Sequence, residues 1–255
     1  MFHFLLRKIP RPILIKFSLI FRHIAPLLYY GKKFEDPISG RTYRKFLPYG
    51  YSGKAKRKNV LCPGSLSLER HRLLWLYLKQ KTNFFSANTL KLLHIAPEQC
   101  FHPLFKKQSN LNYVTADLNS PLADVKMDLH QTPFQNNEFD VIFCNHVLEH
   151  VEDDKQCMRE LYRIMKKGGW GIFQVPQDVN RNLTYEDKSI VSEQDREIHF
   201  WQKDHVRLYG LDYPDRLSEA GFRVEIVDYS NEISSELVER YRLPKGELLY
   251  VCHKD

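Results

Sequence analysis

The chain has 255 residues, of which 43% are hydrophobic and 27% charged, and its net charge is +7. This composition supports a packed core and excludes a wholly disordered chain, while 11 glycines and 13 prolines exclude a collagen-like or low-complexity one. The five cysteines are an odd number without a CxxC pair, which is typical of a reducing compartment rather than of a disulfide scaffold. We therefore predict a cytoplasmic protein.

The charge is divided unevenly along the chain. Residues 1–80 carry 17 Lys and Arg against three acids, a balance of +14, and the remainder has a balance of −7. A basic front favours an anionic partner such as lipid head groups, whereas the acidic body is a poor nucleic-acid surface. Residues 1–33 interleave bulky apolar and basic side chains without the roughly 18–20 apolar residues of a membrane span or a signal-peptide cleavage site.

A helix from Ile13 to about Tyr30 is predicted within this front. It can lie on the inner face of an anionic membrane as a peripheral contact, or it can pack on its own domain with its charges in water. Both interpretations remain open. We take 1–33 as one region, 34–66 as an irregular region with a short hairpin, and 67–255 as the main domain.

The main domain begins with a helix and continues with alternating strands and helices. Ser67 is expected to cap the first helix, with Glu69 in its first turn, and Leu73–Leu78 is apolar all round, as in a buried helix. The later strands are predicted at Leu92–Ala96, Leu111–Ala116, Asp124–Met127, Phe139–Cys144, Trp170–Val175, Phe222–Tyr229 and Glu247–Cys252. Strands separated by helices predict an α/β fold with a mostly parallel, doubly wound sheet.

The clearest helix signal follows the fourth of these strands. Asp153 is placed to cap it, with Gln156 three residues later, and Lys166 and Lys167 are expected in its last turn before Gly168 and Gly169. A further helix is expected to end at Gly221.

Polar residues follow the predicted strands where such a sheet binds its ligand, beyond the carboxyl ends. Asp117 ends the second strand, and its two oxygens can accept both hydroxyls of a ribose. Asp128 ends the third and can accept an exocyclic amine of a base. Either one alone is an ordinary surface acid, but the pair in register with the strands favours a nucleoside site.

Residues 90–176 resemble the class I S-adenosylmethionine-dependent methyltransferases (type 11-like), most specifically in FDVIFCNHVLEHV and the following helix, Gly-Gly and strand. Residues 205–255 resemble them more loosely. The resemblance implies a seven-stranded Rossmann-like sheet with an antiparallel last strand, S-adenosylmethionine as cofactor and methyl transfer as the activity. It implies that Asp117 holds the ribose and Asp128 with Leu129 the adenine. The full cofactor set that it implies is His94, Ala96, Glu98, Asp117, Leu118, Asp128, Leu129 and Asn145.

The first strand-to-helix turn departs from this family. The family usually has an acid and a Gly-x-Gly-x-Gly here, whereas this chain has LLHIAPEQC. His94 stands in place of the acid and Ala96 in place of the first glycine. Either Glu98 binds the ammonium of the methionine part, or the pocket has decayed to an inactive nucleoside-binding module of the same fold. We favour the first, because Asp117 and Asp128 remain in register.

Residues 34–78 resemble the front end of a bacterial methyltransferase group in which a four-cysteine zinc ribbon precedes a SLERHRLLWLYL helix. Here Asp36, Ser39 and Ser65 stand at three of the four ligand positions, and only Cys62 remains. A structural zinc site needs four ligands, so we expect a degenerate ribbon without zinc.

The string His146-Val-Leu-Glu149-His150 also matches the HxxEH motif of inverted zinc peptidases. That chemistry needs the motif inside a long helix, whereas here it directly follows a strand, so the peptidase is a remote alternative and we predict no metal. Asn145 and His146 are expected between cofactor and acceptor, and His150 serves as general base or packs.

Residues Gln177–Leu211 form a long connection that is a natural lid over the acceptor. Its candidate substrate contacts are His199, Trp201, His205, Arg207 and Tyr209. We predict His146, His150 and His199 as the catalytic residues, and a small-molecule, lipid-linked or saccharide-linked acceptor.

Overall fold

The computed structural model describes residues 21–50 and 57–255. The chain divides into two compact units. Unit 1 comprises Met1–Phe85, Gln99–Leu104 and Asp228–Glu247, and unit 2 comprises Ser86–Glu98, Phe105–Val227 and Leu248–Asp255. This division crosses the predicted boundary at residue 66, because the helix that follows it groups with the N-terminal residues. Of the predicted helix Ile13–Tyr30, residues 21–28 are helical and residues 13–20 lie outside the described residues.

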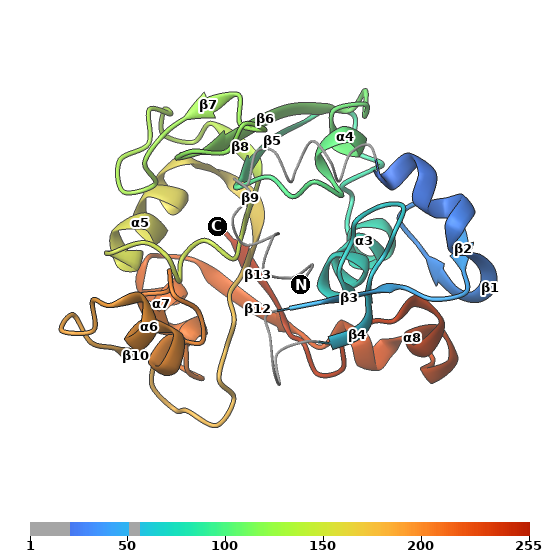
Figure 1. Cartoon of the computed structure of the whole chain (residues 1–255). Helices are drawn as coiled ribbons and strands as arrows, with labels where there is room; N and C mark the ends of the chain where they lie inside the picture. Colours follow the sequence, from blue (N-terminus) through green and yellow to red (C-terminus); the bar gives the residue numbers. More distant parts are fainter. Residues whose placement is uncertain (1–20, 51–56) are drawn as a thin grey trace. The chain divides into compact units, whose positions relative to one another are not determined.

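Unit 2 is built on a seven-stranded sheet in the order β12-β13-β9-β8-β5-β6-β7 (Figure 1). The strands are β5 (Leu90–Ile95), β6 (Leu111–Asp117), β7 (Val125–Lys126), β8 (Phe139–Asn145), β9 (Met165–Gln174), β12 (Arg223–Val227) and β13 (Leu249–His253). The β5–β6, β6–β7, β5–β8 and β8–β9 pairs are parallel, and β13 runs antiparallel to both β9 and β12. The predicted mostly parallel sheet with an antiparallel last strand is confirmed.

The middle strands are buried because apolar side chains cover both faces of the sheet. In β8, six of seven residues are buried, as expected of a parallel strand inside an α/β fold. Helices α5 (Asp154–Ile164) and α7 (Tyr213–Glu219) contribute Leu161 and Leu217 to the core around Ile142. The predicted cap of α5 is correct: the Asp153 carboxylate accepts the Gln156 N–H at 2.9 Å.

The predicted end of α5 is wrong. The helix ends at Ile164, and Lys166, Lys167 and Gly168 belong to β9. Met165 already pairs with Phe139 of β8, and the register then shifts before Trp170. Lys166 forms an ion pair with Asp140 of β8 at 2.8 Å. Pairing with β8 therefore takes these residues from the helix.

The connections of unit 2 contain less helix than predicted. Between β5 and β6 the only helix among the described residues is α4 (His102–Phe105), and no helix separates β6 from β7. The long connection Gln177–Leu211 instead has structure of its own. It contains α6 (Glu193–Phe200) and an antiparallel hairpin of β10 (Tyr185–Glu186) with β11 (Arg207–Leu208).

Unit 1 contains two hairpins where one was predicted. Strand β1 (Tyr30–Asp36) pairs with β2 (Arg41–Tyr43), and β3 (Leu47–Tyr49) pairs with β4 (Arg57–Leu61), all antiparallel. Beside the helical residues 21–28, its described part contains α3 (Glu69–Lys81), the 3-10 turn η2 (Tyr229–Glu232) and α8 (Ser235–Tyr241).

Hydrogen bonds join the turn that contains Asp36 and Ser39 to the turn that contains Ser65 and Ser67. The Asp36 carboxylate is fully buried and accepts the Ser39 hydroxyl at 2.6 Å and the Ser67 hydroxyl at 3.2 Å. The Ser65 hydroxyl donates to Ser67 at 2.8 Å. Burial raises the pKa of the Cys62 thiol to about 11, which keeps it protonated.

Ser67 is not the cap of α3, contrary to the prediction. Leu68 is the N-cap, and the Ser67 carbonyl and hydroxyl instead accept the guanidinium of buried Arg72 at 2.8 and 3.2 Å. The same guanidinium donates to the carbonyls of Tyr241 and Arg242 after α8 at 2.6 and 2.8 Å. Arg72 therefore joins the turns, α3 and the end of α8 within unit 1.

Across residues 21–50 and 57–255, no helix combines the length and apolar character that a membrane crossing requires.

Replacing Asp36 by Ala should lower the free energy of unfolding by about 3 kcal/mol, because it leaves the buried Ser67 hydroxyl without its acceptor and removes a buried negative charge that favours the nearby Arg72 cation. Urea unfolding followed by circular dichroism measures the change. Glu236→Ala, an exposed acid of the same unit, is the control. Equal midpoints for the two variants would contradict the role given to Asp36.

Candidate functional site

The register of the sheet brings the ends of three strands to one edge of unit 2. In β5, Ile95 lies opposite Ala116 of β6 and opposite Cys144 of β8. The residues that follow these strands therefore emerge together, as the sequence predicts.

Glu98 is held by two neighbours at this edge. The buried His94 ring hydrogen-bonds to Glu98 through Nε2 and to the Tyr113 hydroxyl through Nδ1 at 2.9 Å. The Asn145 amide donates to Glu98 at 3.1 Å. Glu98 thus places a carboxylate beside the position where His94 replaces the usual acid. Tyr113, which sequence reasoning missed, orients the His94 ring.

Ala96 adopts the left-handed backbone conformation that glycine favours, with φ of 49°. Its N–H donates to the Ala116 carbonyl at 2.9 Å, so the turn after β5 is tied to β6. The chain therefore makes the backbone turn expected of a glycine at this position, with a Cβ that strains it.

Asp117 ends β6 with a fixed carboxylate. Its Oδ1 accepts the N–H groups of Asn119 and Ser120, both at 2.6 Å. Among the described residues nothing donates to Oδ2, so this oxygen can accept a ligand hydroxyl. The next side chain, Leu118, is 55% exposed.

Asp128 and Leu129 follow β7 and differ in burial. Leu129 is buried in the core, and the Asp128 carboxylate is exposed. Asp128 accepts the His130 N–H at 2.9 Å and contacts the His130 ring at 2.6 Å. The pKa of Asp128 lies below its ordinary value. The main cause is the hydrogen bond from the backbone N–H of His130, and the His130 ring is the next cause. Sequence reasoning missed His130, although it lies only two residues away.

The residues of the HxxEH string lie in turns, with φ of 55° at His146, and not in a helix. The peptidase arrangement is therefore wrong for this chain. Glu149 is 1% exposed and lies 3.4 Å from His146 Nδ1. His150 stacks edge-on against His205 of the lid, with ring centroids 4.7 Å apart.

The charges of this cluster follow from its burial. Burial raises the pKa of Glu149, but the hydrogen bond from His146 and the nearby His150 outweigh it and lower the pKa overall. Burial lowers the pKa of His205. At neutral pH the cluster therefore holds a carboxylate beside a neutral imidazole.

The buried polar atoms at this edge fit a cofactor with hydroxyl and ammonium groups. Asn145 Oδ1 is buried and has no hydrogen-bond partner among the described residues. With Asp117 Oδ2 and the Glu98 carboxylate, it forms an acceptor set on neighbouring strand ends. A buried acceptor such as Asn145 Oδ1 is costly unless a ligand satisfies it.

A family model described as a methyltransferase domain matches residues 93–173. The resemblance of residues 90–176 to methyltransferases is confirmed over the residues matched. The match runs from within β5 to within β9, so it includes every strand end described above, and this family implies S-adenosylmethionine as the cofactor.

Several solved structures are similar to this chain at low identity. They include the YcgJ protein of Bacillus subtilis (14% identical, TM-score 0.46, covering 72% of this chain and 99% of that one). An S-adenosylmethionine-dependent methyltransferase of Archaeoglobus fulgidus is 16% identical (TM-score 0.47, 71% and 93% covered). A putative one of Listeria monocytogenes is 18% identical (0.47, 72% and 99%). With TM-scores below 0.5, these similarities carry no argument about this chain. No curated protein matches the sequence.

Arg207 and Tyr209 of the connection Gln177–Leu211 are not available to a substrate, contrary to the sequence prediction. Arg207 is buried and donates to the carbonyls of Leu148, Val151 and Glu152 at 2.7, 2.5 and 2.8 Å. The buried Tyr209 hydroxyl donates to Asp154 at 2.8 Å. Both side chains hold the segment after β8 in place.

The remaining lid candidates lie on the surface. His199 of α6 contacts the Tyr185 hydroxyl at 3.3 Å, and Trp201 is 48% exposed. In the structure the ring of His205, and not that of His199, packs against the ring of His150.

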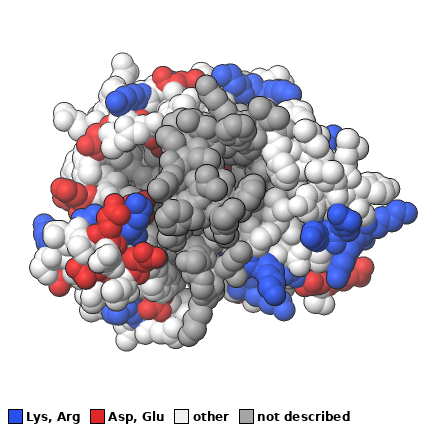
Figure 2. Space-filling model, viewed as in Figure 1, with Lys and Arg blue, Asp and Glu red and all other residues white. Residues whose placement is uncertain are grey.

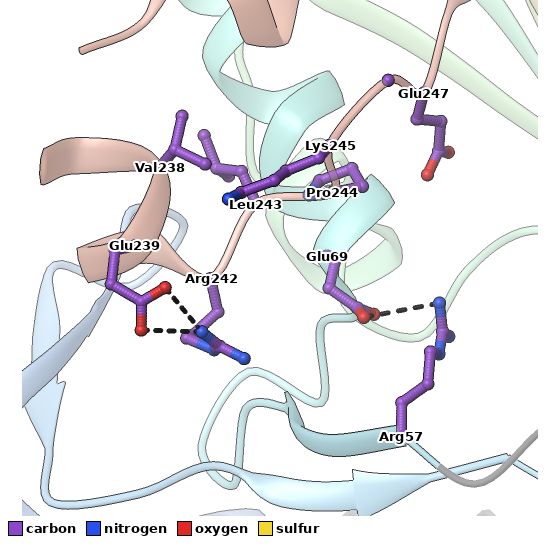
Figure 3. A pocket seen from close by; sticks show the side chains of 10 residues that line it. Arg57, Glu69, Val238, Glu239, Arg242, Leu243, Pro244, Lys245 and Glu247 are labelled. Carbon is purple, nitrogen blue, oxygen red and sulfur yellow. Dashed lines mark hydrogen bonds and ion pairs between the residues drawn. The ribbon is translucent and has the colours of Figure 1, made fainter. Parts of the chain in front are cut away.

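Unit 1 has a separate hollow of about 620 Å³ (Figure 3). Arg57 and Glu69 form an ion pair there at 3.4 Å, and Arg242 and Glu239 form another at 2.8 Å. None of the predicted site residues lines it.

Replacing Ala96 by Gly should raise the free energy of unfolding by about 1 kcal/mol, because glycine adopts the left-handed turn without strain. The matched control is Ala220→Gly. Ala220 has φ of −79°, so glycine relieves no strain there and should destabilise that variant through added chain entropy and the loss of a methyl group packed against the core. Urea unfolding compares the two. Equal destabilisation by both substitutions would contradict the strain at Ala96.

Proposed function

We propose that the protein transfers a methyl group from S-adenosylmethionine to an acceptor oxygen, nitrogen or carbon. The observation that carries this proposal is the set of carboxylates on adjoining strand ends, Glu98 after β5 and Asp117 at the end of β6, within a matched methyltransferase domain. When bound, S-adenosylmethionine supplies an activated methyl group on its sulfonium sulfur.

The chain's own residues would bind and orient the cofactor. Asp117 Oδ2 would accept a ribose hydroxyl, and the Glu98 carboxylate, kept in place by His94 and Asn145, would bind the ammonium. Asp128 with Leu129 would hold the adenine. Most of the rate enhancement would come from holding the acceptor in line with the methyl group.

An acceptor that loses a proton needs a base, and His146 is placed for it. Its Nε2 is buried without a partner among the described residues, and its Nδ1 faces Glu149. A carboxylate that accepts from Nδ1–H holds the ring in the tautomer whose Nε2 lone pair could take a proton. His150 and the exposed His199 are the other histidines proposed from the sequence.

The alternative is a binding module of the same fold without catalysis. The strained Ala96 and the glycine-free turn favour it. Cofactor binding without methyl transfer to any acceptor tested would support this alternative.

Asp117→Ala should weaken S-adenosylmethionine binding by about 2–3 kcal/mol, because it removes charge-assisted hydrogen bonds to the ribose. Isothermal titration calorimetry measures the affinity, and Asp195→Ala on exposed α6 is the control. Wild-type affinity in a folded Asp117→Ala variant would remove the ribose assignment. No binding by the wild-type chain would remove the whole proposal.

We further propose that the basic front makes a peripheral contact with anionic lipid and that the acceptor is lipid-linked or saccharide-linked. Along the helical residues 21–28, Ile24, Leu27 and Leu28 are 52%, 81% and 56% exposed. Exposed Lys32 and Lys33 follow. On the right of the face drawn in Figure 2, clusters of Lys and Arg side chains stand among uncharged ones, with some Asp and Glu below them. Apolar side chains beside basic ones suit an anionic membrane surface.

The full chain should sediment with vesicles that contain anionic lipid at low salt and should be released as salt rises, because the attraction is screened beyond about 10 Å at 0.1 M. Replacing both Leu27 and Leu28 by Ser should reduce this binding. Replacing Leu237, which is 37% exposed on α8, by Ser should leave it unchanged. If the full chain ignores such vesicles at low salt, this contact is excluded.

A further inference from the structure

Three ligand-type side chains converge in unit 2 outside the strand-end acceptor set. Glu149, His150 and His205 each offer an atom, and these three atoms lie within 4.8 Å of one another. Glu149 and His150 come from the turns after β8, and His205 comes from the connection between α6 and β11. The pairing of β8 with its neighbours therefore fixes the positions of Glu149 and His150. The hydrogen bonds of Arg207 independently fix the position of His205.

Both histidines are oriented through their other ring nitrogen. His150 Nδ1 lies 3.1 Å from the Asp204 carbonyl, and His205 Nδ1 lies 2.9 Å from the Phe200 carbonyl. A carbonyl only accepts, so each Nδ1 carries the proton and each Nε2 of a neutral ring has a free lone pair. Metal-binding histidines are typically oriented in this way.

Two atoms of the cluster are buried without a partner. Glu149 and His205 are each 1% exposed. Within the part of the chain that the structure describes, Glu149 Oε2 and His205 Nε2 have no hydrogen-bond partner. An unsatisfied buried acceptor costs about 1–3 kcal/mol, and these two have no donor to satisfy them. A cation between them would satisfy both.

We propose that Glu149, His150 and His205 bind one divalent transition-metal ion. Two imidazoles and a carboxylate suit zinc, iron, cobalt or nickel better than magnesium or calcium, which prefer oxygen ligands. His150 Nε2 lies 3.9 Å from Glu149 Oε1. Ligands on a tetrahedral ion with bonds near 2.1 Å are about 3.4 Å apart, so small side-chain rotations close the site.

This inference revises the expectation of no metal. The HxxEH string contributes Glu149 and His150 as ligands, and His205 replaces the second histidine of a peptidase. His146 instead contacts Glu149 Oε1 through Nδ1 at 3.4 Å, which positions the carboxylate. Three protein ligands leave a coordination position open. That position would bind an oxygen of the acceptor, and this last point alone rests on the proposed function.

The test uses the full chain without a polyhistidine tag, stripped of metal by dialysis against a chelator. Titration with Co²⁺, followed by visible absorption, should give one tightly bound ion per chain, and Zn²⁺ should displace it. His150→Asn and Glu149→Gln should each weaken Co²⁺ binding at least 100-fold, more than the roughly 10–100-fold loss from changing a residue that only supports a ligand. His150 is 34% exposed, so its variant is the safer one for folding.

The matched control is His253→Asn, since His253 also lies beside a carboxylate, 3.4 Å from Glu225. It should bind Co²⁺ like the wild type, and circular dichroism checks that all variants fold. Absence of Co²⁺ binding at millimolar concentration, or unchanged affinity in a folded His150→Asn variant, would overturn the proposal. Calorimetry with S-adenosylmethionine on the metal-free chain tests cofactor binding separately, so the two failures are distinguishable.

Discussion

The register of β5 against β6 and β8 is the constraint on which the candidate site depends. Because Ile95 lies opposite both Ala116 and Cys144, the residues after these strands share one edge. A slip of one residue would turn every side chain of the strand to the other face. The buried side chains of β8 fix the register on both faces of the sheet, so packing in the core positions Glu98, Asp117 and Asn145.

Two places in the chain keep the geometry of a familiar motif with different residues. After β5, Ala96 makes the turn of a glycine, and Glu98 places a carboxylate beside the buried His94. In unit 1, the Asp36 carboxylate, the Ser67 hydroxyl and the Arg72 guanidinium join turns that a zinc ion joins in the resembling ribbon. In both, hydrogen bonds to a buried carboxylate support the local fold.

Much of the fold could be predicted from the sequence because its signals are local. The apolar run of β8, the Asp153 cap of α5 and the alternation of strands and helices all depend on neighbouring residues. The end of α5 could not be predicted in this way, because the pairing of Met165 with Phe139 outweighs the helical preference of the residues that follow. Ser67 was misassigned because its partners, Asp36 and Arg72, come from outside the first turn of the helix.

In the candidate site, too, some residues could be predicted from local sequence signals and others could not. The positions of Asp117 and Asp128 could be predicted because Asp117 ends β6 and Asp128 closely follows β7. The contact of Glu98 with Asn145 joins residues 47 apart in the chain, and the bonds of Arg207 reach back more than 50 residues. No spacing in the sequence indicates such contacts. The sequence alone therefore predicts Arg207 and Tyr209 as substrate contacts. The meeting of His205 with Glu149 and His150 was missed for the same reason.

The most direct test of cofactor binding at the strand ends is a crystal structure of the full chain grown with S-adenosylhomocysteine, the spent cofactor. We expect its ribose hydroxyls at the Asp117 carboxylate and its amino group at Glu98. A saturated crystal with the ligand elsewhere, or with density for it absent from the carboxyl ends of β5, β6 and β8, would contradict the account.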